Sequence, residues 1–205
     1  MGYDPLTRRS AVRSGDPREG GAAAATLAIR LAGAVRLDRR IYAELVVDAG
    51  ATSQALWLVA ILGMAHGAGN VVRGLAFGWN PWEGALFGLT GEVIFFVVSS
   101  LAIYVLGRFA LGATAIYGQV LRPLAFSSEP GFLILIAAAL SLLSQRAAYV
   151  FFPVIIAWRL AAGFVAVREA LGLSKARSMI VLGAGVVLGV AAVGAGSGLL
   201  VLLLE

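Results

Sequence analysis

The sequence predicts an all-α integral membrane protein: a bundle of five transmembrane helices with an N-terminal amphipathic helix. Hydrophobic residues make up 60% of the chain and charged residues 13%, and the mean hydropathy is +0.91. A soluble domain has about 25% charged residues. Apolar runs long enough to cross a bilayer recur along the chain. Lys and Arg gather beside alternate ends of these runs, which is typical of cytoplasmic ends.

The N-terminal region divides into two segments. Residues 1–21 contain Pro and Gly and lack a periodic apolar pattern, so we expect a disordered cytoplasmic tail. Residues 22–48 form the amphipathic segment, with a polar stripe of Arg36, Arg40, Glu44 and Asp48 opposite Leu37, Ile41 and Leu45. If the helix lies on the inner membrane surface, Arg36, Arg39 and Arg40 would lie near anionic headgroups. The alternative is a cytoplasmic helix packed against the membrane domain.

Residues 49–205 form the predicted membrane domain, with spans at about 51–72, 86–106, 130–145, 149–167 and 178–204. The fourth span carries only Arg159 as a charge, and its length of about 28 Å, at about 1.5 Å per residue, matches the hydrocarbon thickness of a bilayer. The run 130–145 is short, so it is either a short span or a re-entrant segment. The mixed segment before it, 111–126, is expected to be a loop or surface segment.

Charge distribution predicts the orientation of the chain. With a cytoplasmic N-terminus, thirteen Lys and Arg lie inside and two outside, and the C-terminus lies outside. The residues expected at the inner membrane surface are Arg36, Arg39, Arg40, Arg168, Lys175 and Arg177. This topology explains the net charge of +5, so we expect no nucleic-acid partner. Fifteen Arg against one Lys, with many Ala and Gly, indicates a GC-rich genome and hence a bacterial cytoplasmic membrane.

Little in the sequence favours catalysis. The absence of Cys excludes disulfides and thiolate chemistry, and a single histidine, His66, argues against a His-based metal site. No phosphate-binding or dinucleotide-binding motif is present. The segment around Ser197 resembles a membrane serine protease loop only superficially, since the first Gly of that motif is missing. We therefore expect a protein that is not an enzyme and has no cofactor and no metal.

Four polar residues within the predicted spans are the candidate site: Glu92, Arg159, His66 and Asn70. Glu92 and Arg159 are predicted to form a buried pair, which is either structural or part of a proton or substrate path. The structural interpretation is favoured because the predicted spans offer no second acid for a relay. His66 and Asn70, four residues apart, share a helix face and form either helix–helix hydrogen bonds or an outward-facing pocket.

Three small-xxx-small pairs are expected to pack within the molecule: Gly63/Gly67, Gly185/Gly189 and Gly194/Gly198. Such pairs let helices approach closely.

Three stretches resemble bacterial members of the Yip (Ypt/Rab-interacting protein) family. They are Trp158-Arg159-Leu160 with 166–176, the segment 121–131, and residues 40–55 at the entry to the first span. The resemblance covers roughly 36–205 and implies a five-helix, non-catalytic membrane protein. The Asp-Leu-Tyr-Gly-Pro motif of eukaryotic trafficking members is missing, so GTPase binding is not implied.

Two functional hypotheses follow. The first is a non-enzymatic scaffold, membrane-organising protein or accessory subunit of the Yip type. The alternative is a small oligomeric transporter or channel that uses the four intramembrane polar residues. The partners expected are the lipid bilayer, other membrane proteins or further copies of the chain. Polar residues that all find partners would favour the scaffold, and a water-accessible path would favour the transporter.

Overall fold

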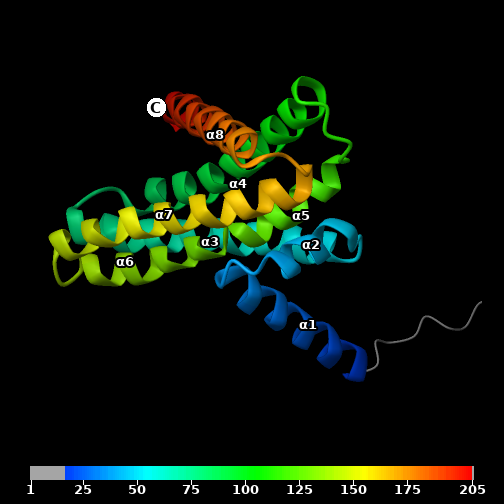
Figure 1. Cartoon of the computed structure of the whole chain (residues 1–205). Coiled ribbons are helices and arrows are strands. Elements are labelled where there is room, and N and C mark those ends of the chain that lie inside the picture. Colours follow the sequence, from blue (N-terminus) through cyan, green and yellow to red (C-terminus); the bar gives the residue numbers. More distant parts are fainter. Residues whose placement is uncertain (1–16, 205) are drawn as a thin grey trace, which may run out of the picture.

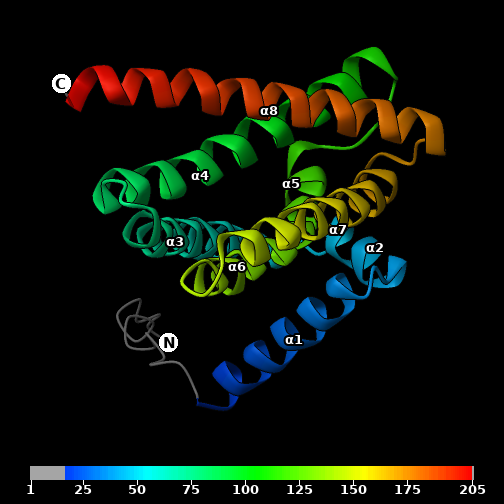
Figure 2. The same ribbon diagram turned by 90° about the vertical axis from the view of Figure 1, so that its left-hand side faces the viewer.

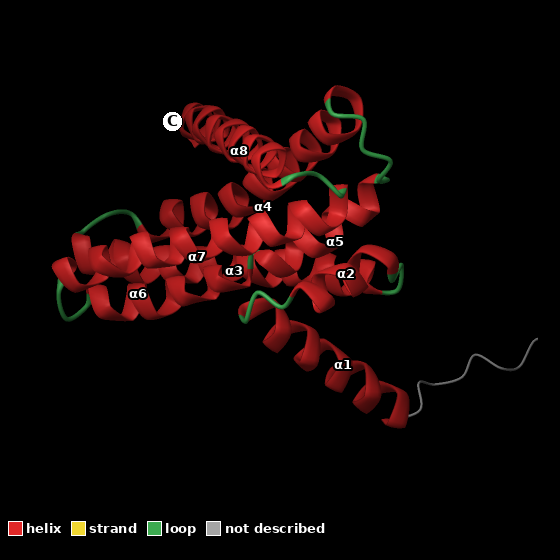
Figure 3. Cartoon of the chain, viewed as in Figure 1, coloured by secondary structure: helices red, strands yellow, loops and turns green. Residues whose placement is uncertain are grey.

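Five apolar helical segments form the body of the protein, as predicted. The computed structural model describes residues 17–204, and within this range the chain is helical between short turns, with no strand (Figures 1 and 3). Four spans are formed by α3 (Ala51–Phe77), α4 (Pro81–Val105), α7 (Gln145–Leu171) and α8 (Lys175–Leu204). A composite segment from Tyr117 to Ser141 makes the remaining one, and all five are long and apolar enough to cross a membrane. The prediction of an all-α, five-span protein is confirmed.

The connections between the spans lie at two opposite ends of the bundle (Figure 1). We call them the α3–α4 end, where α6 (Ile134–Ser141) also joins α7, and the α7–α8 end, where α4 also leads to α5 (Tyr117–Ser127). At the α3–α4 end, α3 terminates at Gly78, whose φ of 75° suits glycine. The Asn80 side chain then caps α4 by accepting hydrogen bonds from the backbone of Trp82 and Glu83.

The third span differs from the prediction. Residues 111–126 were expected to be a loop or surface segment, but α5 occupies Tyr117–Ser127 and is buried from Val120 to Ser127. A 3₁₀ turn, η2 (Glu129–Leu133), joins α5 to α6 and completes a segment of 25 residues. The loop prediction is wrong because the polar groups of Gln119 and Arg122 bond to backbone within the protein rather than to water.

The N-terminal segment is two helices rather than the single amphipathic helix predicted over residues 22–48. α1 (Pro17–Val35) and α2 (Arg39–Val47) are separated by a turn in which Leu37 has a φ of 59° and Asp38 caps α2. The first sixteen residues of the predicted tail 1–21 lie outside the described residues, and the rest begin α1. α2 packs against α5 and α7 and buries Tyr42 and Leu45 completely. This placement favours the protein-packed alternative over a helix that lies on the membrane.

Glycines bring α4 close to two of its neighbours. A Cβ atom on Gly88 of α4 would lie 2.5 Å from the backbone oxygen of His66 on α3. Gly185 and Gly189 of α8 approach Ser99 on the other side of α4 in the same manner. The predicted packing role is therefore confirmed for Gly63/Gly67 and Gly185/Gly189. It is wrong for Gly194/Gly198, where an added Cβ would meet nothing within 4 Å. These two glycines face away from α4, because Gly196 between them is the residue that approaches Ile94, and α8 lies at the outside of the bundle (Figure 2).

Candidate functional site

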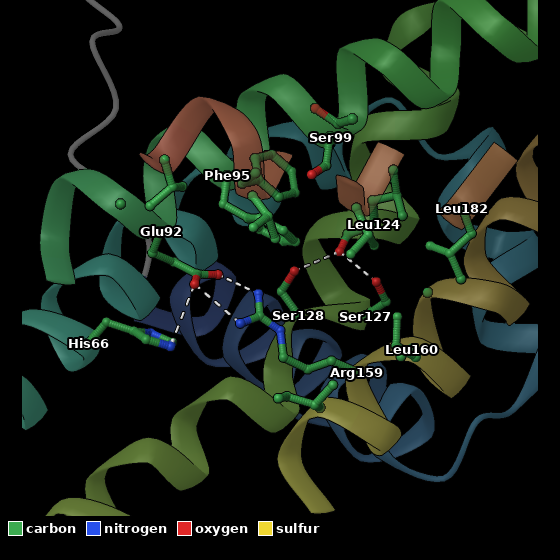
Figure 4. A pocket seen from close by; sticks show the side chains of 18 of the residues that line it. His66, Glu92, Phe95, Ser99, Leu124, Ser127, Ser128, Arg159, Leu160 and Leu182 are labelled. Atoms are coloured by element: carbon green, nitrogen blue, oxygen red, sulfur yellow. Dashed lines mark hydrogen bonds and ion pairs between the residues drawn. The ribbon is translucent and has the colours of Figure 1, made fainter. Parts of the chain in front are cut away.

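An ion pair links α4 to α7 near the middle of both helices. Arg159 Nη2 lies 2.5 Å from Glu92 Oε1, and Nη1 lies 3.2 Å from Oε2, so the guanidinium and the carboxylate face each other with two contacts (Figure 4). The Glu92 side chain is only 6% exposed and that of Arg159 is 20% exposed. α4 and α7 have almost no direct packing contact. The ion pair is therefore their main connection, and the predicted pairing is present.

His66 of α3 is the third member of this cluster. Its Nε2 lies 3.5 Å from Glu92 Oε2, and its Nδ1 lies 3.0 Å from the backbone oxygen of Leu62 (Figure 4). Both ring nitrogens thus face oxygen acceptors, so a doubly protonated ring would have an acceptor for each N–H group. We call Glu92, Arg159 and His66 the triad.

Asn70 lies on the face that it shares with His66, one turn nearer the α3–α4 end. Its Oδ1 accepts a hydrogen bond of 3.4 Å from Arg73. The guanidinium of Arg73 in turn stacks on Trp79 and Phe152, at 5.8 Å and 4.9 Å from the ring centroids. In the described structure, Asn70 therefore lies beside the triad but bonds to none of its three members.

The triad borders a cavity of about 480 Å³ that lies between α4, α7 and α8, with walls from α3 and α5 (Figure 4). All four predicted residues line it. Most of the remaining lining is apolar, for example Phe95 and Leu124, and Arg159 stacks over the Phe95 ring at 5.6 Å. At the rim, Ile156 and Val190 are more than half exposed. The cavity therefore combines a charged corner with an apolar interior and an apolar rim.

A second cavity of about 320 Å³ lies towards the α3–α4 end and is lined by Arg73, Trp79, Asn80 and Glu83, among others. Asn70 and Phe87 line both cavities. The two spaces therefore meet at these two side chains. Together the two cavities lead from the triad towards the surface of the α3–α4 end, and the side chains of Asn70 and Phe87 stand between them.

The predicted basic surface residues lie apart from the cavity. Arg36 and Arg40 are exposed in and after the α1–α2 turn, and Arg39 bonds to Glu169 of α7 at 2.6 Å. Arg168 lies in the last turn of α7, and Lys175 and Arg177 are exposed at the start of α8. None of them contacts the triad in the described structure.

Sequence reasoning missed two buried polar groups that the third span contributes. Arg122 donates through Nε and Nη2 to the backbone oxygens of Leu45 and Val46, and through Nη1 to Thr52. Glu129 lies in η2, within the third span, so the domain contains a second intramembrane acid. The expectation that no such acid exists is wrong, because Glu129 directly precedes the span predicted at 130–145 and was placed outside it. Two charges, Arg122 and Glu129, within a mostly apolar segment of 25 residues were the available signal.

Among the described residues, no three His, Asp or Glu side chains lie close enough together to hold a metal ion. No family model, curated protein or solved structure matches the chain.

Proposed function

We propose that the protein is a non-enzymatic membrane protein of the transporter type, which binds a small amphipathic molecule in the cavity between α4 and α7. The observation that carries this proposal is the position of the cavity. It surrounds the triad and Asn70, the four residues that the sequence identifies as out of place in a membrane. A purely structural ion pair has no need of open space beside it.

The lining indicates the chemistry of the ligand. Apolar side chains such as Phe96 and Val186 surround most of the space, while the triad occupies one corner. A molecule with one polar or charged group and an apolar body would satisfy both parts, as small-molecule sites usually do. The apolar rim at Ile156 and Val190 would let such a molecule enter from the hydrocarbon region, and the junction at Asn70 and Phe87 offers a route towards the α3–α4 end.

The packing of the helices supports movement across this cavity. α4 packs on α3 and α8, whereas α7 packs on α5 and α6 and also touches α8. The cavity lies between α4 and α7, and the Glu92–Arg159 pair joins the two helices at one corner of it. Rigid-body motion of one group of helices against another is a common basis of alternating access.

The second candidate is the scaffold or accessory subunit that the resemblance to Yip proteins implies. The complete pairing of the triad supports it, as does the open face of α8 around Gly194 and Gly198, which could receive another helix or a second copy. Under either proposal, we expect the α7–α8 end to lie in the cytoplasm, because Arg168, Lys175 and Arg177 gather there. The membrane would be a bacterial cytoplasmic membrane.

Cysteine accessibility separates the two candidates, and the chain has no native Cys. Ser128 lines the cavity, so Ser128→Cys should react with a small charged methanethiosulfonate applied from the α3–α4 end in proteoliposomes. Adding Phe87→Ala should accelerate the reaction by opening the junction. The control is Ala138→Cys on α6, which is buried outside the cavity and should stay unreactive. An unreactive Ser128→Cys, with reaction at an exposed Trp82→Cys as reagent control, would favour the scaffold.

A further inference from the structure

The turn η2 divides the third span near its midpoint, since Glu129 lies about equally far from Tyr117 and Ser141. It packs against α3, α6 and α7, and also against α1 and α5. Glu129 is the first residue of this turn, after Ser128, which lines the cavity. The turn thus places a partly buried acid at the middle of the third span.

The carboxyl group of Glu129 has an unusual environment. Its Oε2 atom is buried and accepts no hydrogen bond, and no ion pair of Glu129 occurs among the described residues. Glu92 has Arg159 and His66 as partners, and Glu44 and Asp48 share Arg30. Glu129 is therefore the acid in the described structure that combines a buried, unbonded carboxylate oxygen with the lack of a counterion.

The charged groups on the elements around η2 either have other partners or lie at the ends of their helices. Arg30 of α1 bonds to Glu44 and Asp48, and Arg122 of α5 bonds to backbone oxygens. On α7, Arg159 bonds to Glu92, Glu169 bonds to Arg39, and Arg168 lies in the last turn. α6 carries no charged residue.

Two further titratable groups come near the turn. Tyr42 of α2 donates its hydroxyl hydrogen to the backbone oxygen of Ala34, and burial, with a smaller contribution from Glu129, raises the pKa of this phenol. Tyr42 is therefore neutral and offers Glu129 no positive charge. His66 of α3 lies against the backbone of the turn, since a Cβ on Gly131 would be 3.3 Å from its Cε1 atom.

We propose that Glu129 is a proton-binding site in the middle of the membrane domain, separate from the triad. An ionised carboxylate that is buried without a counterion is strongly unfavourable, and such a group takes up a proton instead. The triad differs because Arg159 stabilises the charge of Glu92. This proposal does not depend on what the cavity binds.

The position of the turn links the proton site to the cavity. Ser128 and His66 both line the cavity, one preceding Glu129 in the chain and the other touching Gly131. A change in the protonation of Glu129 that moves η2 would therefore reach His66 directly. Proton uptake at one site could then alter the geometry of the other.

Reaction with a hydrophobic carbodiimide tests the proposal on the full chain in lipid. The O–H group of a protonated carboxyl adds across one C=N bond: the proton passes to nitrogen and the carboxyl oxygen bonds to the central carbon. Acyl migration to nitrogen then gives a stable N-acylurea that peptide mass spectrometry locates. Glu129 should carry most of the intramembrane label, and Glu92 should carry little because Arg159 and His66 occupy its carboxylate oxygens.

Matched variants make the result decisive. Glu129→Gln should lose the intramembrane label, whereas Glu92→Gln should retain it on Glu129. Labelling the detergent-unfolded chain shows that the peptide containing residue 129 is detectable. A folded protein without label on Glu129, or one whose Glu129 reacts with a water-soluble carbodiimide as readily as the exposed Glu83, would overturn the proposal.

Discussion

The backbone of α4 lies directly against the backbone of α3, whereas α4 reaches α7 only through side chains that extend beside a cavity. The first contact depends on Gly88, which leaves no room for even a methyl group beside His66. The second depends on the Glu92–Arg159 pair, beside about 480 Å³ of open space. A close-packed contact resists sliding, while an ion pair can separate and re-form. The comparison therefore identifies the α4–α7 side as the one able to move.

The largest expected effect is on the close-packed side. Gly88→Ala should destabilise the protein by about 3 kcal/mol, because the new methyl group would overlap backbone atoms of His66 and Gly67 that cannot rotate away. Unfolding in mixed micelles with increasing SDS measures the change.

Gly183→Ala on α8 is the matched control, since a Cβ there meets nothing within 4 Å. It should be neutral or raise stability by up to about 1 kcal/mol through helix propensity. Equal effects of the two substitutions would show that α3 and α4 are not in such close contact.

A smaller effect is expected on the α7 side. Arg159→Leu and Glu92→Leu should each cost about 2–3 kcal/mol, because each leaves a charge unpaired, with solvent in the cavity reducing the penalty. The double variant should cost less than the sum, by about 1–2 kcal/mol, since it removes both charges together. The same SDS titration completes the double-mutant cycle. Additive effects would mean that the two side chains do not interact.

The smallest effect concerns an ion pair that touches neither side of α4. Hydrogen bonds from Arg30 and from the backbone N–H of Gly50 hold the pKa of Asp48 below its ordinary value. A depressed pKa means that the carboxylate stabilises the fold above its unfolded pKa of about 3.9, and that this contribution is lost as the pH falls through the lower folded value. Thermal midpoints should therefore fall below about pH 4.

Asp48→Asn isolates this contribution. The variant should melt lower than the parent near neutral pH, and the two should converge in acid. The gap should be modest because the Asp48 side chain is 37% exposed. A gap that stays constant from neutral to acidic pH would show that the charge of Asp48 contributes nothing.

The sequence was most informative where hydrophobicity alone decides the structure. Long apolar runs predicted four of the spans, and the cost of charge in a membrane identified Glu92 and Arg159, which the structure pairs. Spacing of four placed His66 and Asn70 on one face, and both line the cavity. The cavity itself was not predictable, because it depends on how far α8 diverges from α7.

The errors arose where a polar group is satisfied by a distant part of the chain. Arg122 looked like a loop residue, but its partners are backbone oxygens more than seventy residues earlier. The break at Leu37 carries no Gly or Pro signal, and it forms because α2 packs against the bundle and Asp38 caps it. Asp38 is a local capping signal, but local patterns contain neither the packing of α2 nor the distant partners of Arg122.

The contacts of Arg122 also bear on how the protein is made. An arginine within a membrane segment opposes insertion of that segment by about 2.5–3.5 kcal/mol. Leu45 and Val46, whose oxygens accept its hydrogen bonds, precede it in the chain and are therefore synthesised first. When the third span leaves the ribosome, acceptors for its guanidinium already exist beside the first span. The order of synthesis thus supplies the partner before the charge that needs it enters the bilayer.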